Sequence, residues 1–146
     1  MKIAIGSDHA GLNLKNEIIE YLKGKNIEVL DEGTYGPESV DYPDFAAKVC
    51  RDYVTGLVDY GILVCYTGIG MSMAANKVKG VRASLVGIVE DAVLTKEHNN
   101  ANVLCLSAKN TKTELALEIV DAFLTTEFTY GRHERRVQKV MDIENE

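Results

Sequence analysis

Short apolar runs alternate along the chain with longer stretches that have helical spacing. The apolar runs predict five strands, at residues 2–7, 27–30, 60–64, 81–86 and 102–106. Between them, apolar positions recur every three or four residues, as Leu14, Ile18 and Leu22 do, which is typical of one face of a helix. The regular order of strand and helix favours a parallel sheet with helices packed on it.

Polar residues near the ends of the helical stretches predict where helices begin. Asp41 suits an N-cap followed by Pro43 in the first turn, and Thr111 with Glu114 has the spacing of a capping box. Helices are also expected at residues 41–55, 72–77 and 90–97, and a basic helix opens at residue 131. We therefore predict one domain, residues 1–146, with an α/β fold: a Rossmann-like, doubly wound, five-stranded parallel sheet with an extra C-terminal helix.

The composition narrows the class of protein. With 46% apolar residues the chain is expected to form one globular core, and a net charge of −6 argues against nucleic-acid binding. No apolar run has the length of a membrane span, and the N-terminal stretch, residues 1–8, reaches a charge at Asp8 too soon for a signal peptide. Three cysteines without a CxxC pair argue against a disulfide framework and a thiolate metal site. We therefore expect a cytoplasmic protein that binds no membrane.

One stretch, residues 61–72, combines several features of a ligand site. An apolar run ends in Cys65, and Gly68 and Gly70 then form a tight turn before a helix. In parallel sheets ligands bind at the carboxyl ends of strands, and a glycine turn at a helix N-terminus offers N–H groups to an anion. The same local field stabilises a thiolate. The stretch predicts a base or nucleophile beside an anion cradle, although a small buried cysteine beside a bend has the same pattern.

Other polar groups follow the predicted strands. Asp8 and His9 come after the first strand and Lys109 after the fifth, so we expect them at the same sheet edge as Cys65. Asp8 would equally suit a helix cap. His98 follows a helix and belongs to the opposite edge, where it is either an exposed loop residue or joins the site through a neighbouring subunit.

Arg132 and Arg136 lie four residues apart and share one helix face, which suits a phosphate or carboxylate as well as a solvated basic surface.

Two activities are disfavoured by the sequence. The first turn, residues 6–11, lacks the GxGxxG fingerprint, so NAD binding is discounted. A cysteine phosphatase would need an arginine six residues after Cys65, where Met71 stands.

Together these residues resemble the ribose-5-phosphate isomerase B family, which includes the galactose-6-phosphate isomerase subunits. The resemblance covers nearly the whole chain. Its motifs are GSDHAG at residues 6–11, EGTY at 32–35, VDYP at 40–43, CYTGIG at 65–70, AANK at 74–77, GVRA at 80–83, EHNNAN at 97–102 and GRHERRV at 131–137.

The resemblance implies an aldose–ketose isomerase that interconverts ribose 5-phosphate and ribulose 5-phosphate without a metal or organic cofactor. In such an enzyme Cys65 removes the proton beside the carbonyl to give a cis-enediolate, Thr67 moves a proton between the oxygens, and His98 opens the sugar ring. The implied substrate-binding residues are Asp8, His9, Tyr42, Tyr66, Gly68, Ile69, Gly70, Asn99, Lys109, Arg132 and Arg136. The family site is shared between subunits, so a homodimer or tetramer is implied.

Four positions depart from the family pattern. Tyr66 and Tyr130 stand where glycines are usual, and Val93 and Lys109 stand where arginines are usual. Lys109 keeps the charge but lacks the bidentate fork of arginine. The substrate is therefore open between ribose 5-phosphate and erythrose 4-, allose 6- or galactose 6-phosphate, and we expect Tyr66 to reshape the sugar pocket. A non-catalytic sugar-phosphate-binding module is the remaining alternative.

Overall fold

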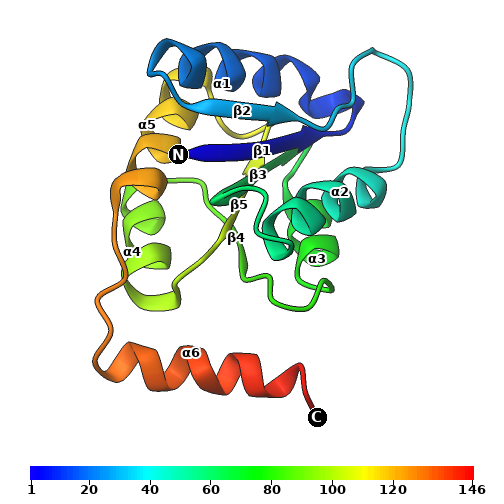
Figure 1. Cartoon of the computed structure of the whole chain (residues 1–146). Helices are drawn as coiled ribbons and strands as arrows, with labels where there is room; N and C mark the ends of the chain where they lie inside the picture. The colour runs from blue at the N-terminus through cyan, green and yellow to red at the C-terminus, as the bar shows by residue number, and fades with distance from the viewer.

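The computed structural model describes all 146 residues and contains one five-stranded parallel sheet (Figure 1). The strand order is β2-β1-β3-β5-β4. The strands are β1 (Lys2–Ser7), β2 (Glu28–Asp31), β3 (Tyr60–Cys65), β4 (Ala83–Leu85) and β5 (Val103–Ser107). The predicted Rossmann-like α/β fold is therefore confirmed, and β1, β3 and β5, the three strands that precede the candidate residues, lie side by side.

Helices cover both faces of the sheet. The helical elements of the chain are the 3-10 turn η1 (His9–Gly11), α1 (Leu12–Gly24), α2 (Tyr42–Val54), α3 (Ile69–Ala75), α4 (Val89–Asn99), α5 (Thr113–Thr125) and, apart from the sheet, α6 (Arg132–Ile143). One hydrophobic cluster joins the sheet to α1, α4 and α5, and a second joins its other face to α2 and α3. None of the helices combines the length and apolar character needed to span a membrane.

Several element ends differ from the sequence prediction. The segment expected as a strand at 81–86 forms one only at Ala83–Leu85. At its start, the side chains of Asn102 and Asn76 accept hydrogen bonds from the N–H groups of Arg82 and Ala83, each at 2.8 Å, in place of strand pairing. The capping box at Thr111 is wrong: α5 begins at Thr113 after Lys112, and Thr111 is buried. Asp41 does precede α2, but its side chain makes no capping hydrogen bond.

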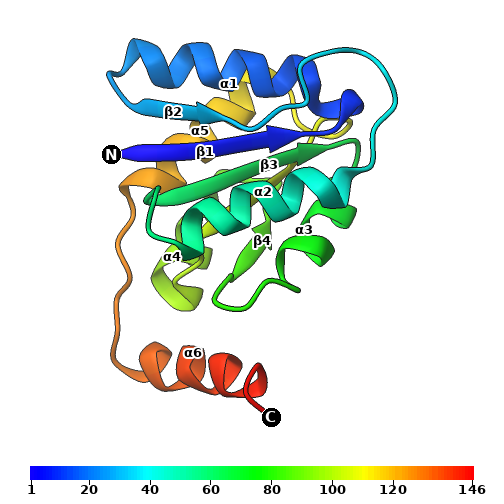
Figure 2. The same cartoon turned by 45° about the vertical axis from the view of Figure 1, so that its right-hand side comes forward.

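The last helix, α6, lies apart from the sheet and none of its residues is buried (Figures 1 and 2). Two consecutive residues with left-handed φ, Tyr130 at 59° and Gly131 at 58°, turn the chain into it. Both the N–H and the hydroxyl of Thr129 donate to the carbonyl of Glu97, and the carboxylate of Glu144 accepts from Gly80 N–H at 3.0 and 3.2 Å. The helix is therefore attached to the body near both of its ends.

Two lysines are buried between the helices and the sheet, in different surroundings. Lys15 in α1 is fully buried, and its Nζ lies 2.6 Å from Oδ1 of Asp31. Lys96 in α4 is 2% exposed, and its Nζ has no hydrogen-bond acceptor. Instead it lies 3.8 and 4.8 Å from the ring centroids of Tyr60 and Phe123. Burial without an anionic partner lowers the pKa of Lys96 to about 8.

Lys96→Met is expected to raise the free energy of unfolding at pH 7 by about 1–3 kcal/mol, because methionine fills the site without a charge to desolvate. The unfolded chain holds the lysine proton up to about pH 10.4, whereas the folded chain releases it near pH 8. Between these values the unfolded state binds more protons, so the cost of the wild-type lysine shrinks as the pH rises. Denaturant unfolding should therefore show a clearly larger gain at pH 7 than at pH 10.

Lys15→Met is the matched control for this substitution. It removes the ionic partner of Asp31, so it is expected to lower the free energy of unfolding instead of raising it. If both lysine variants were destabilised by similar amounts, the Lys96 ammonium would not carry the cost assigned to it.

Candidate active site

Three of the predicted groups meet at the carboxyl edge of the sheet. The N–H of Asp8 donates to the carbonyl of Val64 at 3.3 Å, which brings the turn after β1 against the end of β3. On the other side, the N–H groups of Ala108 and Lys109 donate to the carbonyls of Cys65 and Tyr66, at 2.9 and 2.8 Å. The turns after β1 and β5 therefore flank the turn after β3, as predicted.

The turn after β3 depends on Gly68, which adopts a left-handed φ of 78°. A Cβ there would collide with the Leu85 side chain and lie 3.0 Å from the backbone of Leu106. This conformation lets α3 begin at Ile69, three residues earlier than predicted. The N–H groups of Thr67 and Gly68 donate to no acceptor within the chain.

Cys65 lies at the base of this turn, with 5% of its surface exposed. Two contacts shape the turn that follows it. The hydroxyl of Thr67 accepts from the N–H of Ile69 at 3.3 Å. The Tyr42 ring, at the start of α2, lies against Gly70 so closely that a Cβ at that position would be 2.6 Å from the ring. The thiol, the Thr67 hydroxyl and the free N–H groups therefore belong to one compact loop.

Asp8 and His9 follow β1 directly. Asp8 is buried, and its Oδ1 accepts from the N–H of Gly11 at 3.1 Å. It therefore caps η1, which is the helix-cap role given above as the alternative for this residue. The Nδ1 of His9 accepts from the N–H of Val40 at 3.2 Å. Because this bond assigns the lone pair to Nδ1, the neutral ring carries its proton on Nε2, which remains a donor for an anion.

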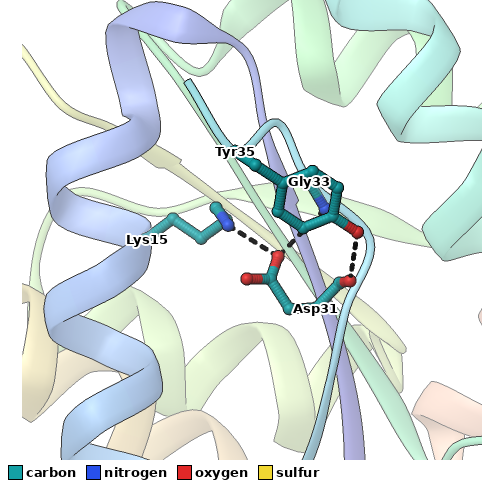
Figure 3. A network of polar contacts seen from close by, with 4 residues as sticks. All are labelled: Lys15, Asp31, Gly33 and Tyr35. Carbon is teal, nitrogen blue, oxygen red and sulfur yellow. Dashed lines mark hydrogen bonds and ion pairs between the residues drawn. The ribbon is translucent and has the colours of Figure 1, made fainter. Parts of the chain in front are cut away.

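A polar network that the sequence analysis missed holds the loop that carries Val40 (Figure 3). Oδ1 of Asp31 accepts from Nζ of Lys15 at 2.6 Å and from the N–H of Gly33 at 2.9 Å, and the Tyr35 hydroxyl donates to the Asp31 carbonyl at 2.8 Å. Gly33 O then accepts from Ser7 N–H at 2.7 Å. One signal was available in the sequence: Lys15 lies on the apolar face of its helix.

A second group of candidate residues lies elsewhere, in a cavity of about 690 Å³ between α6 and the body of the domain. His98, Asn99, Arg132 and Arg136 all line it, and Cys65 does not. His98 stands at the end of α4, and the chain then enters β5 at its amino end. The structure therefore separates His98 from Cys65 within one chain, as the strand-end argument predicted.

The sequence analysis gave no role to His133, which stacks on His98 with ring centroids 4.2 Å apart and an interplanar angle of 12°. Desolvation, together with the charges of His98, Arg132 and Arg136, lowers the pKa of His133. The two rings therefore form one stacked pair in the cavity that Arg132 and Arg136 also line. The sequence predicted the helix that carries His133 but not its stacking on His98, because that contact depends on how α4 and α6 pack.

The chain contains no group of three or more His, Cys, Asp or Glu residues that could hold a metal ion. Its other two cysteines, Cys50 and Cys105, are fully buried, and burial raises the pKa of the Cys50 thiol to about 12 and raises that of Cys105 as well. Cys65 is the cysteine that stands at a strand end beside unpaired N–H groups.

A parallel α/β domain with a thiol and free N–H groups at its carboxyl edge, and two arginines on an outlying helix, is suited to a small anionic substrate. The ribose/galactose isomerase family model matches residues 3–140, and the chain belongs to that family. The resemblance found in the sequence is therefore confirmed.

Individual relatives agree with this assignment. The chain is 44% identical over 143 residues to ribose-5-phosphate isomerase B of Escherichia coli, covering 98% of this chain and 96% of the relative. Ribose-5-phosphate isomerase B of Clostridium thermocellum has a TM-score of 0.98 and 51% identity, covering 99% and 98% of the two chains. The Mycoplasma genitalium enzyme, solved with bound ribulose-5-phosphate, has a TM-score of 0.94 and 47% identity, covering 99% and 97%.

Proposed function

We propose that the chain is a cofactor-independent isomerase that interconverts ribose 5-phosphate and ribulose 5-phosphate through a cis-enediolate. The observation that carries this proposal is that Cys65 ends β3 directly before the turn in which the N–H groups of Thr67 and Gly68 are unpaired. The ribulose-5-phosphate bound to the Mycoplasma genitalium relative supports the choice of substrate. Three free, buried cysteines support a reducing, cytoplasmic location.

The proposed reaction moves one proton between neighbouring carbons. The Cys65 thiolate removes the proton from the carbon beside the carbonyl, and negative charge develops on the carbonyl oxygen. The N–H groups of Thr67 and Gly68 stabilise that charge, a contribution of about 2.7–4 kcal/mol for each donor in comparable sites. The Thr67 hydroxyl transfers a proton between the two oxygens, and the thiol returns its proton to the neighbouring carbon.

The phosphate needs cationic or hydrogen-bond-donating groups at the far end of the sugar. This chain offers His9, through Nε2–H, and Lys109, on either side of Cys65. The other residues implied by the family, His98, Asn99, Arg132 and Arg136, line the separate cavity under α6. We therefore propose a homo-oligomer in which a second copy supplies these four side chains, with His98 opening the sugar ring.

The exposed apolar surface supports such an assembly. Large apolar side chains remain exposed on the Cys65 loop, on α3, around β4 and on α6, namely Tyr66, Ile69, Met73, Leu85, Ile88, Val140 and Ile143. A second copy that buried this surface would also bring its α6 towards the first copy's thiol.

Isomerisation of a panel of sugar phosphates tests the proposed function. Erythrose 4-, ribose 5-, allose 6- and galactose 6-phosphate are each supplied with EDTA present, and ribose 5-phosphate is expected to have the highest kcat/KM. If a hexose phosphate turns over fastest, the isomerase assignment stands and the pentose assignment is wrong. If no sugar turns over and no solvent deuterium enters a bound sugar phosphate, the chain is a binding module.

A further inference from the structure

The residue after Cys65 is a tyrosine whose backbone is tied to the turn after β5. Its carbonyl accepts two hydrogen bonds, from the N–H of Lys109 at 2.8 Å and from the Ser107 hydroxyl at 2.9 Å. The same hydroxyl accepts from the N–H of Asn110 at 3.0 Å. The backbones of Tyr66 and Lys109 therefore form one rigid unit that joins the ends of β3 and β5.

The side chains of this unit also interact. Nζ of Lys109 lies 5.6 Å from the ring centroid of Tyr66, within the range of a cation–π contact. Lys109 forms no ion pair, since the salt bridges of the chain involve Lys2, Lys15 and Lys25. The Tyr66 side chain is 56% exposed within one chain. The Lys109 ammonium is therefore directed by the Tyr66 ring and by no carboxylate.

We propose that Tyr66 is a positioning residue that holds the Lys109 ammonium at a set distance from the Cys65 thiol and thereby selects the length of the sugar phosphate. The inference rests on the proposed function, in which the thiol acts at one end of the substrate and Lys109 binds the phosphate at the other.

The physical reason lies in the flexibility of lysine. An unrestrained lysine has four rotatable bonds and a compact charge, so alone it defines the phosphate position poorly. When one side of the ammonium lies against the Tyr66 ring, its remaining N–H groups can reach fewer phosphate positions than those of an unrestrained lysine. The distance from that region to the thiol then favours one chain length over others.

A double-mutant cycle on Tyr66→Leu and Lys109→Met tests the inference. Loss of one exposed cation–π contact corresponds to a change of about two- to fivefold, which is expected in KM more than in kcat. The double variant should bind the sugar phosphate no worse than Lys109→Met alone. Once the Lys109 ammonium is absent, loss of the Tyr66 ring has no further effect on its position. Tyr66→Phe keeps a ring and should have a lower KM than Tyr66→Leu.

The same variants report on substrate length. In Tyr66→Leu the ratio of kcat/KM for hexose and pentose phosphates should shift from the wild-type ratio, and in Tyr66→Phe it should shift less. Additive effects in the cycle, or a phenylalanine variant as impaired as the leucine variant, would overturn the inference while leaving an active isomerase. A wild-type protein that turns over no sugar phosphate overturns the proposed function and this inference with it.

Discussion

Cys65→Ser is expected to lower kcat for ribose 5-phosphate by about 10²–10⁴-fold, the usual contribution of a general base. Serine has nearly the same size, so the turn before α3 should be retained, but a hydroxyl ionises far less readily than a thiol. The measurement is the initial rate of ketose formation at saturating substrate. The thermal melting curve of the same sample establishes that the variant is folded.

Cys50→Ala is the matched control for the loss of a thiol. Cys50 lies in α2, is fully buried, and has a pKa raised to about 12 by burial, so it takes no part in proton transfer near neutral pH. The alanine variant should keep its activity with some loss of stability. Comparable rates for Cys65→Ser and Cys50→Ala would remove Cys65 from the mechanism.

Mixing two inactive variants is expected to restore activity if the site is shared between copies. In a dimer of Cys65→Ser and His98→Asn chains, one of the two sites receives an intact Cys65 and an intact His98. Random assortment of subunits in a symmetric dimer then restores about a quarter of the wild-type activity. The physical basis is the separation of the two residues within one chain, where His98 lines the cavity under α6 and Cys65 does not.

The mixing experiment needs exchange of subunits, so the two variants are unfolded together and refolded, or expressed together in one cell. Samples that are mixed after folding, without time for exchange, serve as the control and should stay inactive. If refolded mixtures also stay inactive while refolded wild type recovers, each site is built from a single chain.

Much of the fold follows from local pattern. The strands were predictable because buried parallel strands are continuous apolar runs, as in residues 60–64, and because a glycine or polar turn ends each run. The prediction of a capping box at Thr111 was wrong because it used only the local spacing of residue types, whereas the burial of Thr111 is determined by tertiary packing. β4 was predicted too long because the side chains of Asn76 and Asn102 replace strand pairing at its start.

The candidate site was predictable in part for a similar reason. The rule that parallel strands end at one edge was enough to bring His9, Cys65 and Lys109 together and to separate them from His98. That rule says nothing about contacts between elements. The ion pair of Lys15 with Asp31 and the contact of Lys109 with Tyr66 arise from packing across the sheet edge, so they became visible only in the structure.

The attachment of α6 has a consequence for how this protein can evolve. Because no residue of α6 is buried, its outward side chains can change without disturbing either hydrophobic cluster of the domain. In the proposed homo-oligomer, two copies that diverge after a gene duplication could therefore acquire α6 surfaces that no longer accept each other, while each sheet keeps its stability. Selectivity in that proposed assembly and stability of the fold would then be inherited on separate parts of the chain.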